Sequence, residues 1–283
     1  MSMKSSQLSD ETLKAIEALA VDLARLAGSE ITAALGGSLA VRYKPGAEDA
    51  LSLRDPVSEV DTRVEEIIRL RLADSFPDHE ILGEEFDDAR IYGSGFIWAV
   101  DPIDGTTNFV NGFPLFAGSI GVLYEGRPVA GALWVSTSHA LRPGIYHARK
   151  SGPLMFETDV ITPSANAAVR RRLVGQPGLV EQRGIIAEPR KTGSAAVECA
   201  FVAAGLMQAA WFAAPNVWDV AGGLALVEAA GGAVQTRGPE GWAPFSAFAG
   251  PTGEDEIPDL RAWRQPIAIG EATMVEDLCA ALA

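Results

Sequence analysis

Cysteine and histidine are both scarce in this chain. Its 283 residues include two cysteines, Cys199 and Cys279, and three histidines. One cysteine pair cannot build a disulfide framework or a cysteine zinc site, and both cysteines lie in apolar, helix-like stretches, so we expect buried, reduced thiols. We expect surface or turn positions for the histidines, which are His79, His139 and His147.

Long uninterrupted hydrophobic runs are also missing. The longest apolar stretch, 199–215, contains Gln208 and ends at Pro215, so it is too short and too interrupted to span a bilayer. Near the amino terminus, charges such as Glu11 and Lys14 interrupt the apolar core that a secretory signal needs, so an amphipathic helix is expected there. The predicted location is cytoplasmic, with no membrane partner.

Basic residues are outnumbered in this chain. There are 23 lysines and arginines against 37 acidic residues, which gives a formal net charge of -14. This excess argues against nucleic acid or an anionic membrane as the main partner. The 48% hydrophobic and 21% charged residues are ordinary for a globular protein, and the length allows one large α/β domain or two smaller ones.

Helical periodicity dominates the first 75 residues. Apolar residues at helical spacing predict a first helix over 9–35, ended by two glycines, and a second helix over about 57–75. Asp61 falls on the apolar stripe of the second helix, and a carboxylate on a buried face needs a polar partner. The intervening segment 38–54 is predicted to be irregular or a hairpin.

The rest of the chain shows alternating strand and helix patterns. Short strands are predicted at 81–82 and 96–100, whereas the segment 159–193 has no clear pattern and its arginine run 170–172 is interpreted as a solvated surface. The further predicted elements are strands at 116–124, 128–135 and 144–148, a helix at 194–204, a strand at 208–213, a helix at 217–230, a strand at 233–236 and a closing helix from Ala272.

Two aspartates follow directly after the predicted strand 96–100. Residues 98–108 read Trp-Ala-Val-Asp-Pro-Ile-Asp-Gly-Thr-Thr-Asn, which places Asp101 and Asp104 in turn-forming pairs at the strand's carboxyl end, where open α/β sheets bind ligands. Two carboxylates so close to an apolar run would repel each other unless a hard cation such as Mg²⁺ lay between them. The backbone N–H groups of residues 105–107 could then bind a phosphate. The pattern indicates a metal-dependent phosphatase.

Each acidic residue has a commoner explanation when it is considered alone. Asp-Pro-x-Asp-Gly is more often only a turn, and Asp219 could be a first-turn acid that faces a helix dipole. Glu84 alone would most often lie in a solvated loop, Asp61 would pair with an arginine, and Thr106 would bond its own backbone. The alternative to a metal site requires all of these coincidences together.

The acidic residues and their local sequences closely resemble those of the inositol monophosphatase family of Mg²⁺-dependent, typically lithium-sensitive phosphatases. The resemblance covers most of the chain and is specific because four motifs occur in the same order. It implies a layered α/β (α+β) sandwich of helices and sheets, with an α+β half over 1–150 and an α/β half over 151–283 that completes the active site. The motifs are 55–61, 81–85, 98–109 and 218–222.

The same resemblance implies the roles of individual residues. One Mg²⁺ would be held by Glu84, Asp101 and the carbonyl of Ile103. A second would be held by Asp101, Asp104 and Asp219. A third ion could join during turnover. Thr106 with Asp61 would orient and deprotonate the attacking water. The amides of Gly105 and Thr106 would hold the phosphate. The expected reaction is in-line hydrolysis of a small phosphate monoester without a covalent phosphoenzyme, by a homodimer.

The sequence departs from the family pattern where the substrate would be recognised. Typical members that cleave inositol phosphates carry a glutamate seven residues before the aspartate of the Trp-Asp motif, and this chain has Phe212 there. Phenylalanine cannot accept hydrogen bonds from a polyol, so the substrate could be less hydroxylated or aromatic. Ser194 and Arg190 are further candidates for the substrate pocket.

Several activities therefore stay open. The substrate could be a sugar or polyol phosphate such as inositol 1-phosphate. It could also be fructose 1,6-bisphosphate, a 3'(2'),5'-bisphosphate nucleotide or histidinol phosphate. A rival of another class is a non-catalytic regulatory protein that binds a metal or an anion. That rival predicts loss of the water-activating pair, yet both Asp61 and Thr106 are present.

Overall fold

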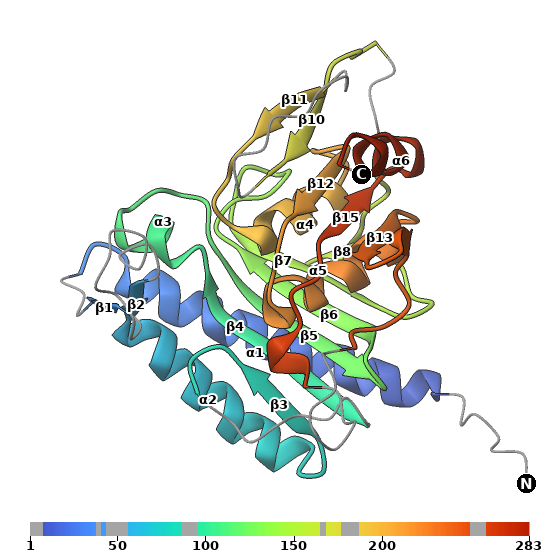
Figure 1. Ribbon diagram of the computed structural model, residues 1–283. Coiled ribbons are helices and arrows are strands. Elements are labelled where there is room, and N and C mark those ends of the chain that lie inside the picture. Colours follow the sequence, from blue (N-terminus) through green and yellow to red (C-terminus); the bar gives the residue numbers. More distant parts are fainter. Residues whose placement is uncertain are drawn as a thin grey trace, which may run out of the picture.

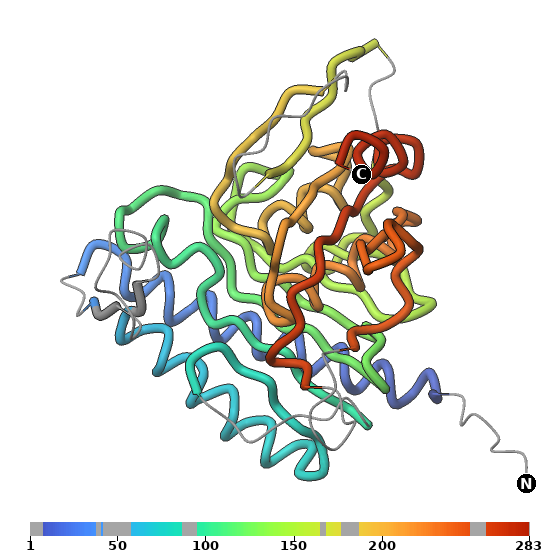
Figure 2. Tube along the Cα trace, in the orientation of Figure 1, coloured from blue at the N-terminus to red at the C-terminus, as the bar shows by residue number. Residues whose placement is uncertain are grey.

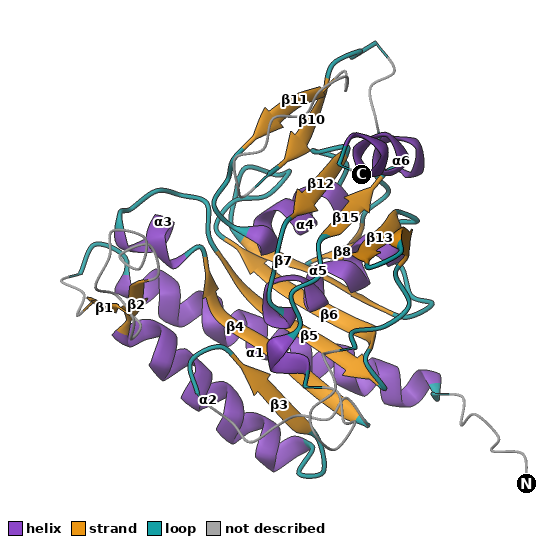
Figure 3. Cartoon of the chain, viewed as in Figure 1, coloured by secondary structure: helices purple, strands orange, loops and turns teal. Residues whose placement is uncertain are grey.

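The computed structural model describes residues 8–37, 41–43, 56–86, 95–164, 168–176, 187–249 and 259–282. These residues form alternating layers of helices and sheets, which confirms the predicted layered α/β sandwich (Figures 1 and 3). The layers are, in order, helices α1 (Asp10–Ala34) and α2 (Glu59–Ser75), a seven-stranded sheet, helices α4 (Ala195–Ala203) and α5 (Val217–Ala229), a six-stranded sheet and helix α6 (Ala272–Ala281).

The seven-stranded sheet follows the chain order, from β3 to β9. Its first two strands are parallel and the others are antiparallel, as the sequence predicts for the strands after residue 116. Strand β4 is longer than the predicted 96–100 and includes both aspartates of the central motif. The strands are β3 (Glu80–Gly83), β4 (Phe96–Asp104), β5 (Ala117–Tyr124), β6 (Arg127–Val135), β7 (Gly144–Arg149), β8 (Met155–Phe156) and β9 (Asp159–Val160).

Helices α1 and α2 cover one face of this sheet because both carry a continuous apolar stripe. Ile16 and Ile31 on α1 and Ile68 on α2 are fully buried against alternate residues of β4 to β7. Ser9 accepts a hydrogen bond from the Thr12 amide and so caps the start of α1. The predicted boundaries of these two helices are confirmed to within two residues.

Helix α5 packs against the opposite face of the sheet at backbone contact distance. A Cβ atom on Gly121 of β5 would lie 2.4 Å from the amide nitrogen of Gly222, and one on Gly131 of β6 would lie 2.2 Å from the Gly222 carbonyl oxygen. Only glycine at both strand positions allows this approach. The contact fixes the distance between α5, which carries Asp219 in its first turn, and the strand pair beside β4.

The six-stranded sheet has the order β11-β10-β12-β15-β13-β14. Strands β10 and β11 come from the segment that the sequence left unassigned, and β14 and β15 were also not predicted. Helix α6 covers the outer face of this sheet, and Figure 2 follows the chain from α1 on one side of the molecule to α6 on the other. The strands are β10 (Arg172–Gly175), β11 (Ala187–Arg190), β12 (Ala209–Phe212), β13 (Ala233–Gly238), β14 (Gly241–Pro244) and β15 (Ile267–Gly270).

Four short elements complete the described fold. Strand β1 (Val41–Tyr43) pairs with β2 (Pro56–Ser58), helix α3 (Thr106–Val110) follows β4, and the 3-10 helix η2 (Leu260–Ala262) precedes β15. The rest of the predicted irregular segment 38–54 lies outside the described residues. No helix in the described part of the chain is long and apolar enough to cross a membrane.

The two cysteines are confirmed as buried free thiols. The prediction for the histidines is wrong at His147, which lies on β7 with its ring against α1. Its Nδ1 is 2.8 Å from a carboxylate oxygen of Glu17, and its Nε2 is 2.9 Å from the Glu157 carbonyl. Both neighbours accept hydrogen bonds only, so this environment selects the doubly protonated ring.

Candidate active site

A register shift in β4 turns Asp101 and Asp104 toward the same side of the sheet. Residues three apart in a regular strand face opposite sides. Here Asp101 pairs with Ser119 and Asp104 with Ala117, so β4 has one residue more than β5 over this interval. This β-bulge reverses the alternation, and both carboxylates come to lie on the side of α4 and α5.

The start of α4 holds Asp104. Its Oδ2 accepts a hydrogen bond from the Ser194 hydroxyl at 2.6 Å and another from the Ala196 amide. Ser194 is also the N-cap of α4, since its hydroxyl accepts from the Val197 amide at 3.1 Å. Ser194, predicted as a substrate-pocket residue, therefore contacts a carboxylate of the site.

Thr106 and Asp61 lie in direct contact. The Thr106 hydroxyl is 3.2 Å from Oδ1 of Asp61 and 2.8 Å from the carbonyl oxygen of Ile103, and its single proton can serve either. The other Asp61 oxygen accepts from both the amide and the hydroxyl of Ser58 at the start of α2. Burial raises the pKa of Asp61 to about 6, against the lowering effect of the Ser58 bonds. At neutral pH one oxygen of an ionised Asp61 is thus left for the Thr106 proton.

Three neighbouring elements position Glu84, which follows β3. The amide of Glu84 donates to the Val100 carbonyl of β4 at 3.2 Å. Oε2 of Glu65, a fully buried residue of α2, accepts from the Glu85 amide at 2.8 Å. On the other side, one Arg261 nitrogen donates to the carbonyls of Gly83 and Phe86, both at 2.7 Å. The backbone on both sides of Glu84 is therefore fixed.

Arg261 also connects this turn to Asp219. Its guanidinium carbon lies 5.2 Å from the ring centroid of Trp218, the residue before Asp219. Asp219 is the third residue of α5, and its Oδ2 accepts from the Asn216 amide at 2.8 Å in a capping box. The Asn216 side-chain amide also donates to Oδ1 at 3.3 Å, so the helix start accounts for contacts of both oxygens.

Four carboxylates share one electrostatic environment. Burial raises the pKa of Asp101 well above its usual range, and the charges of Glu84, Asp104 and Asp219 raise it further. The pKa of Asp219 is raised by burial and then by Asp104 and Glu84, and burial raises that of Asp104 to about 6. Acids that raise one another's pKa lie within reach of a common charge, so a single cation would stabilise all of them.

The oxygen Oδ1 of Asp101 is the clearest indication that a cation fits here. It is buried, since Asp101 is only 2% exposed, and it has no hydrogen-bond partner among the residues that the structure describes. An ionised oxygen in that position costs several kcal/mol unless a positive charge compensates it. As the described side chains stand, no three acidic or histidine groups surround one point, since Asp104 and Asp219 each direct an oxygen to helix N–H donors.

Two other predicted residues lie apart from this acidic cluster. Phe212 is only 3% exposed and packs in the core between the seven-stranded sheet and the six-stranded sheet. Arg190 is exposed at the end of β11, where Nη1 donates to the Pro189 carbonyl and lies 3.5 Å from Glu188. Their predicted contact with a substrate stays a prediction.

Sequence reasoning missed three polar residues that support the site. Glu65 and Arg261 hold the turn that carries Glu84, and Glu198 accepts from the amide and the hydroxyl of Thr192, two residues before Ser194. Burial raises the pKa of Glu198 to about 8. Glu65 and Glu198 both fall on buried helix faces, the same pattern that drew attention to Asp61, whereas nothing local indicates Arg261.

Known proteins resemble this chain over most of its length. The profile of the inositol monophosphatase family matches residues 12–255. An inositol-1-monophosphatase of Mycobacterium leprae is 33% identical over 253 residues, which are 81% of this chain and 82% of that protein. The chloroplastic phosphatase IMPL1 of Arabidopsis thaliana is 32% identical over 76% of this chain, and the match spans 60% of that protein's length.

A solved structure shares the fold. The inositol monophosphatase of Anabaena (Nostoc) sp. PCC 7120 superposes with a TM-score of 0.69 at 22% identity, over 95% of this chain and 96% of that one. The family match includes all four acidic motifs and both residues of the Thr106–Asp61 pair. This chain belongs to the inositol monophosphatase family.

Proposed function

We propose that this protein hydrolyses a small phosphate monoester and that the reaction depends on Mg²⁺. The observation that carries the proposal is the cluster of four buried or partly buried carboxylates around the unpartnered oxygen of Asp101. Glu84, Asp101 and the Ile103 carbonyl would hold one ion. Asp101, Asp104 and Asp219 would hold a second. Carboxylate and carbonyl oxygens are the ligands that Mg²⁺ prefers.

The chain's own residues would divide the chemistry between them. Mg²⁺, when bound, supplies Lewis acidity that makes water a better nucleophile and stabilises the leaving oxygen. Thr106 would take a proton from the attacking water while its own hydroxyl proton moves toward Asp61, whose other oxygen Ser58 already occupies. The amides of Gly105 and Thr106 would bind the phosphate oxygens, and a covalent phosphoenzyme is not required.

The proposed substrate is a sugar or polyol phosphate. The family match supports this class, of which inositol 1-phosphate is one member. Because Phe212 is a core residue, it offers no acceptor for the hydroxyl groups of a polyol. Fructose 1,6-bisphosphate, a 3'(2'),5'-bisphosphate nucleotide and histidinol phosphate are the alternative substrates. We further propose a cytoplasmic homodimer in which residues 1–150 and 151–283 form two halves around the site.

Phosphate release from a panel of these esters tests the proposal. We expect turnover of at least one ester with Mg²⁺ and none with EDTA. Asp104→Asn should lose this turnover while its circular dichroism spectrum is unchanged, and Asp277→Asn, an exposed aspartate on α6, should behave as wild type.

Two outcomes would contradict the proposal. Full activity of Asp104→Asn would reject the two-metal assignment. Binding of Mg²⁺ without release of phosphate from any ester would favour the non-catalytic regulatory protein instead.

A further inference from the structure

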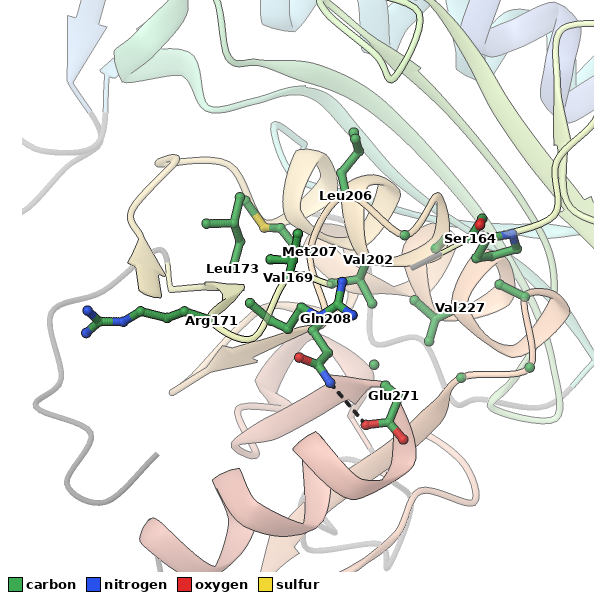
Figure 4. A pocket seen from close by; sticks show the side chains of 18 residues that line it. Ser164, Val169, Arg171, Leu173, Val202, Leu206, Met207, Gln208, Val227 and Glu271 are labelled. Carbon is green, nitrogen blue, oxygen red and sulfur yellow. Dashed lines mark hydrogen bonds between the residues drawn. The ribbon is translucent and has the colours of Figure 1, made fainter. Parts of the chain in front are cut away.

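A second cavity lies at the ends of α4 and α5 that are remote from the acidic cluster. Its volume is about 620 Å³, within the usual range for small-molecule sites. Figure 4 shows side chains from α4, α5, β10 and the adjoining loops around it, among them Val202 and Leu206 near the end of α4, Val227 on α5 and Leu173 on β10. None of the residues of the acidic cluster lines this cavity.

Exposed apolar side chains form the rim of the cavity. Val169 is 45% exposed and Leu206 is 41% exposed, and both are among the few large hydrophobic residues with this much exposure in the described chain. Met207 and Val202 continue the apolar wall inward and are buried. Apolar surface that remains in contact with water at a concave site is typical of ligand-binding pockets.

The β10 side of the cavity carries Arg172. Arg172 is half-buried, and its guanidinium makes no ion pair or hydrogen bond with the residues that the structure describes. The neighbouring Arg171 is paired with Glu188 at 3.0 Å. The one acid of the lining, Glu271, accepts from the Thr273 and Met274 amides at the start of α6. The lining therefore carries two arginines against one acid, in a chain whose net charge is -14.

A hydrogen-bond acceptor without a partner among the described residues lies beside β10, since the Gln208 backbone amide donates to the Leu173 carbonyl at 2.8 Å. The Gln208 side chain donates from Nε2 to Glu271 at 3.3 Å, the contact drawn dashed in Figure 4. Its Oε1 is buried and has no hydrogen-bond partner among the described residues. A buried amide oxygen without a donor is costly, so a donor on a ligand would be stabilised here.

We propose that this cavity binds a small amphipathic organic anion that carries one hydrogen-bond donor. Its anionic group would pair with Arg172, its apolar body would pack on Val169, Leu206 and Met207, and its donor would meet Gln208 Oε1. The binding site is separate from the acidic cluster, because α4 and α5 are about 13 and 20 Å long and the cluster lies at their other ends. The inference does not depend on the proposed phosphatase activity.

The fluorescent probe 1-anilinonaphthalene-8-sulfonate has each of these chemical features: two apolar ring systems, a sulfonate and one N–H donor. Titration of EDTA-treated protein tests the proposal, since without metal the acidic cluster repels a sulfonate. We expect saturable binding of one probe per chain. The neutral probe N-phenyl-1-naphthylamine keeps the rings and the N–H donor but lacks the charge, and it should bind about tenfold more weakly.

Matched variants separate the cavity from other surfaces. Arg172→Gln should weaken sulfonate binding about tenfold and leave the neutral probe unchanged. Arg170→Gln makes the same charge change at an exposed position outside the cavity and should have no effect. Leu206→Ser should weaken both probes, whereas Leu141→Ser, at a residue 90% exposed on another surface, should weaken neither.

Three results would overturn the proposal. These are equal effects of Arg170→Gln and Arg172→Gln, probe binding that never saturates at one per chain, and wild-type binding by Leu206→Ser. Circular dichroism of each variant shows whether it is folded. Because no metal or substrate is present, these results are independent of the outcome of the phosphatase assay.

Discussion

The two ends of α4 and α5 have opposite chemistry. At their first turns, carboxylates are held by hydrogen bonds: Asp104 by Ser194 and Ala196, and Asp219 by Asn216. At their last turns, the cavity has apolar walls, and both Arg172 and Gln208 Oε1 lack partners among the described residues.

This difference shows how one pair of helices can support two unrelated sites. The N-terminal ends offer N–H groups, which fix carboxylates in place before any cation binds. The C-terminal ends are followed by turns and face the ends of β10, β12 and β15, and the cavity lies between them. The first end is organised for a charged reaction, and the second for an apolar ligand.

The largest effect is expected from removal of a carboxylate at one end of α5 only. Asp219→Asn should lower kcat/KM for the best ester by at least about 1,000-fold, because a ligand to a catalytic cation is lost. Glu228→Gln removes a carboxylate near the other end of the same helix and should leave kcat/KM within about twofold. Similar losses in both variants would show that the charge of α5, rather than the position of Asp219, matters.

A smaller loss is expected when the proton pathway is removed and the carboxylates are kept. Thr106→Val retains the shape of the side chain but cannot transfer a proton to Asp61, so kcat should fall about 100-fold with little change in KM. Thr106→Ser restores the hydroxyl and should recover most of kcat. A Thr106→Val enzyme with wild-type kcat would exclude Thr106 from proton transfer.

Arg261 offers a test of how strongly the N-terminal end is organised by remote contacts. Arg261→Met should raise the Mg²⁺ concentration for half-maximal activity about tenfold, because the Gly83 and Phe86 carbonyls lose their donor and the turn that carries Glu84 loosens. Arg264 lies over the same Trp218 ring but does not contact those carbonyls, so Arg264→Met is the matched control. Equal shifts in the two variants would contradict this role.

The smallest effect is expected at His147, which lies at neither end of α4 and α5. A change there should affect the stability of the protein and not its activity. Burial alone would lower its pKa, but hydrogen bonds to Glu17 and to the Glu157 carbonyl raise it above 6.5. A raised histidine pKa adds stability that is fully present below pH 6.5 and is lost as the pH rises through the folded-state value. The free energy of unfolding should fall by about 1–2 kcal/mol over that range.

His147→Gln should remove this pH dependence of stability and leave kcat/KM unchanged. Urea unfolding at a series of pH values measures it. A variant with the same pH slope as wild type would show that other groups dominate the slope.

The sequence predicts the acidic cluster at the first turns of α4 and α5 better than the cavity at their last turns, because the cluster is encoded in local motifs. Asp101, Asp104, Glu84 and Asp219 belong to short motifs with acids directly after apolar strands or at helix starts, so the cluster was predicted residue by residue. The β-bulge that turns Asp104 toward α4 was not, because it depends on pairing with β5.

The cavity could not be predicted because its lining comes from segments far apart in sequence. Val169, Leu206 and Glu271 belong to three different stretches, and none has an unusual local pattern. The arginine run was interpreted as a solvated surface, which fits exposed Arg170 but not half-buried Arg172. Likewise, strands β10, β11 and β15 are four residues each, and an alternating apolar pattern cannot be recognised over so few residues.

Calorimetric titration of the metal-free protein with Mg²⁺ tests the central claim, that the acids at the N-terminal ends of α4 and α5 form a cation site around Asp101. The wild-type protein should bind at least two ions. Asp101→Asn, which replaces the unpartnered oxygen, should weaken both binding events by about 100-fold or more while the protein stays folded. Binding by Asp101→Asn with wild-type affinity, or no binding by the wild-type protein, would contradict the account.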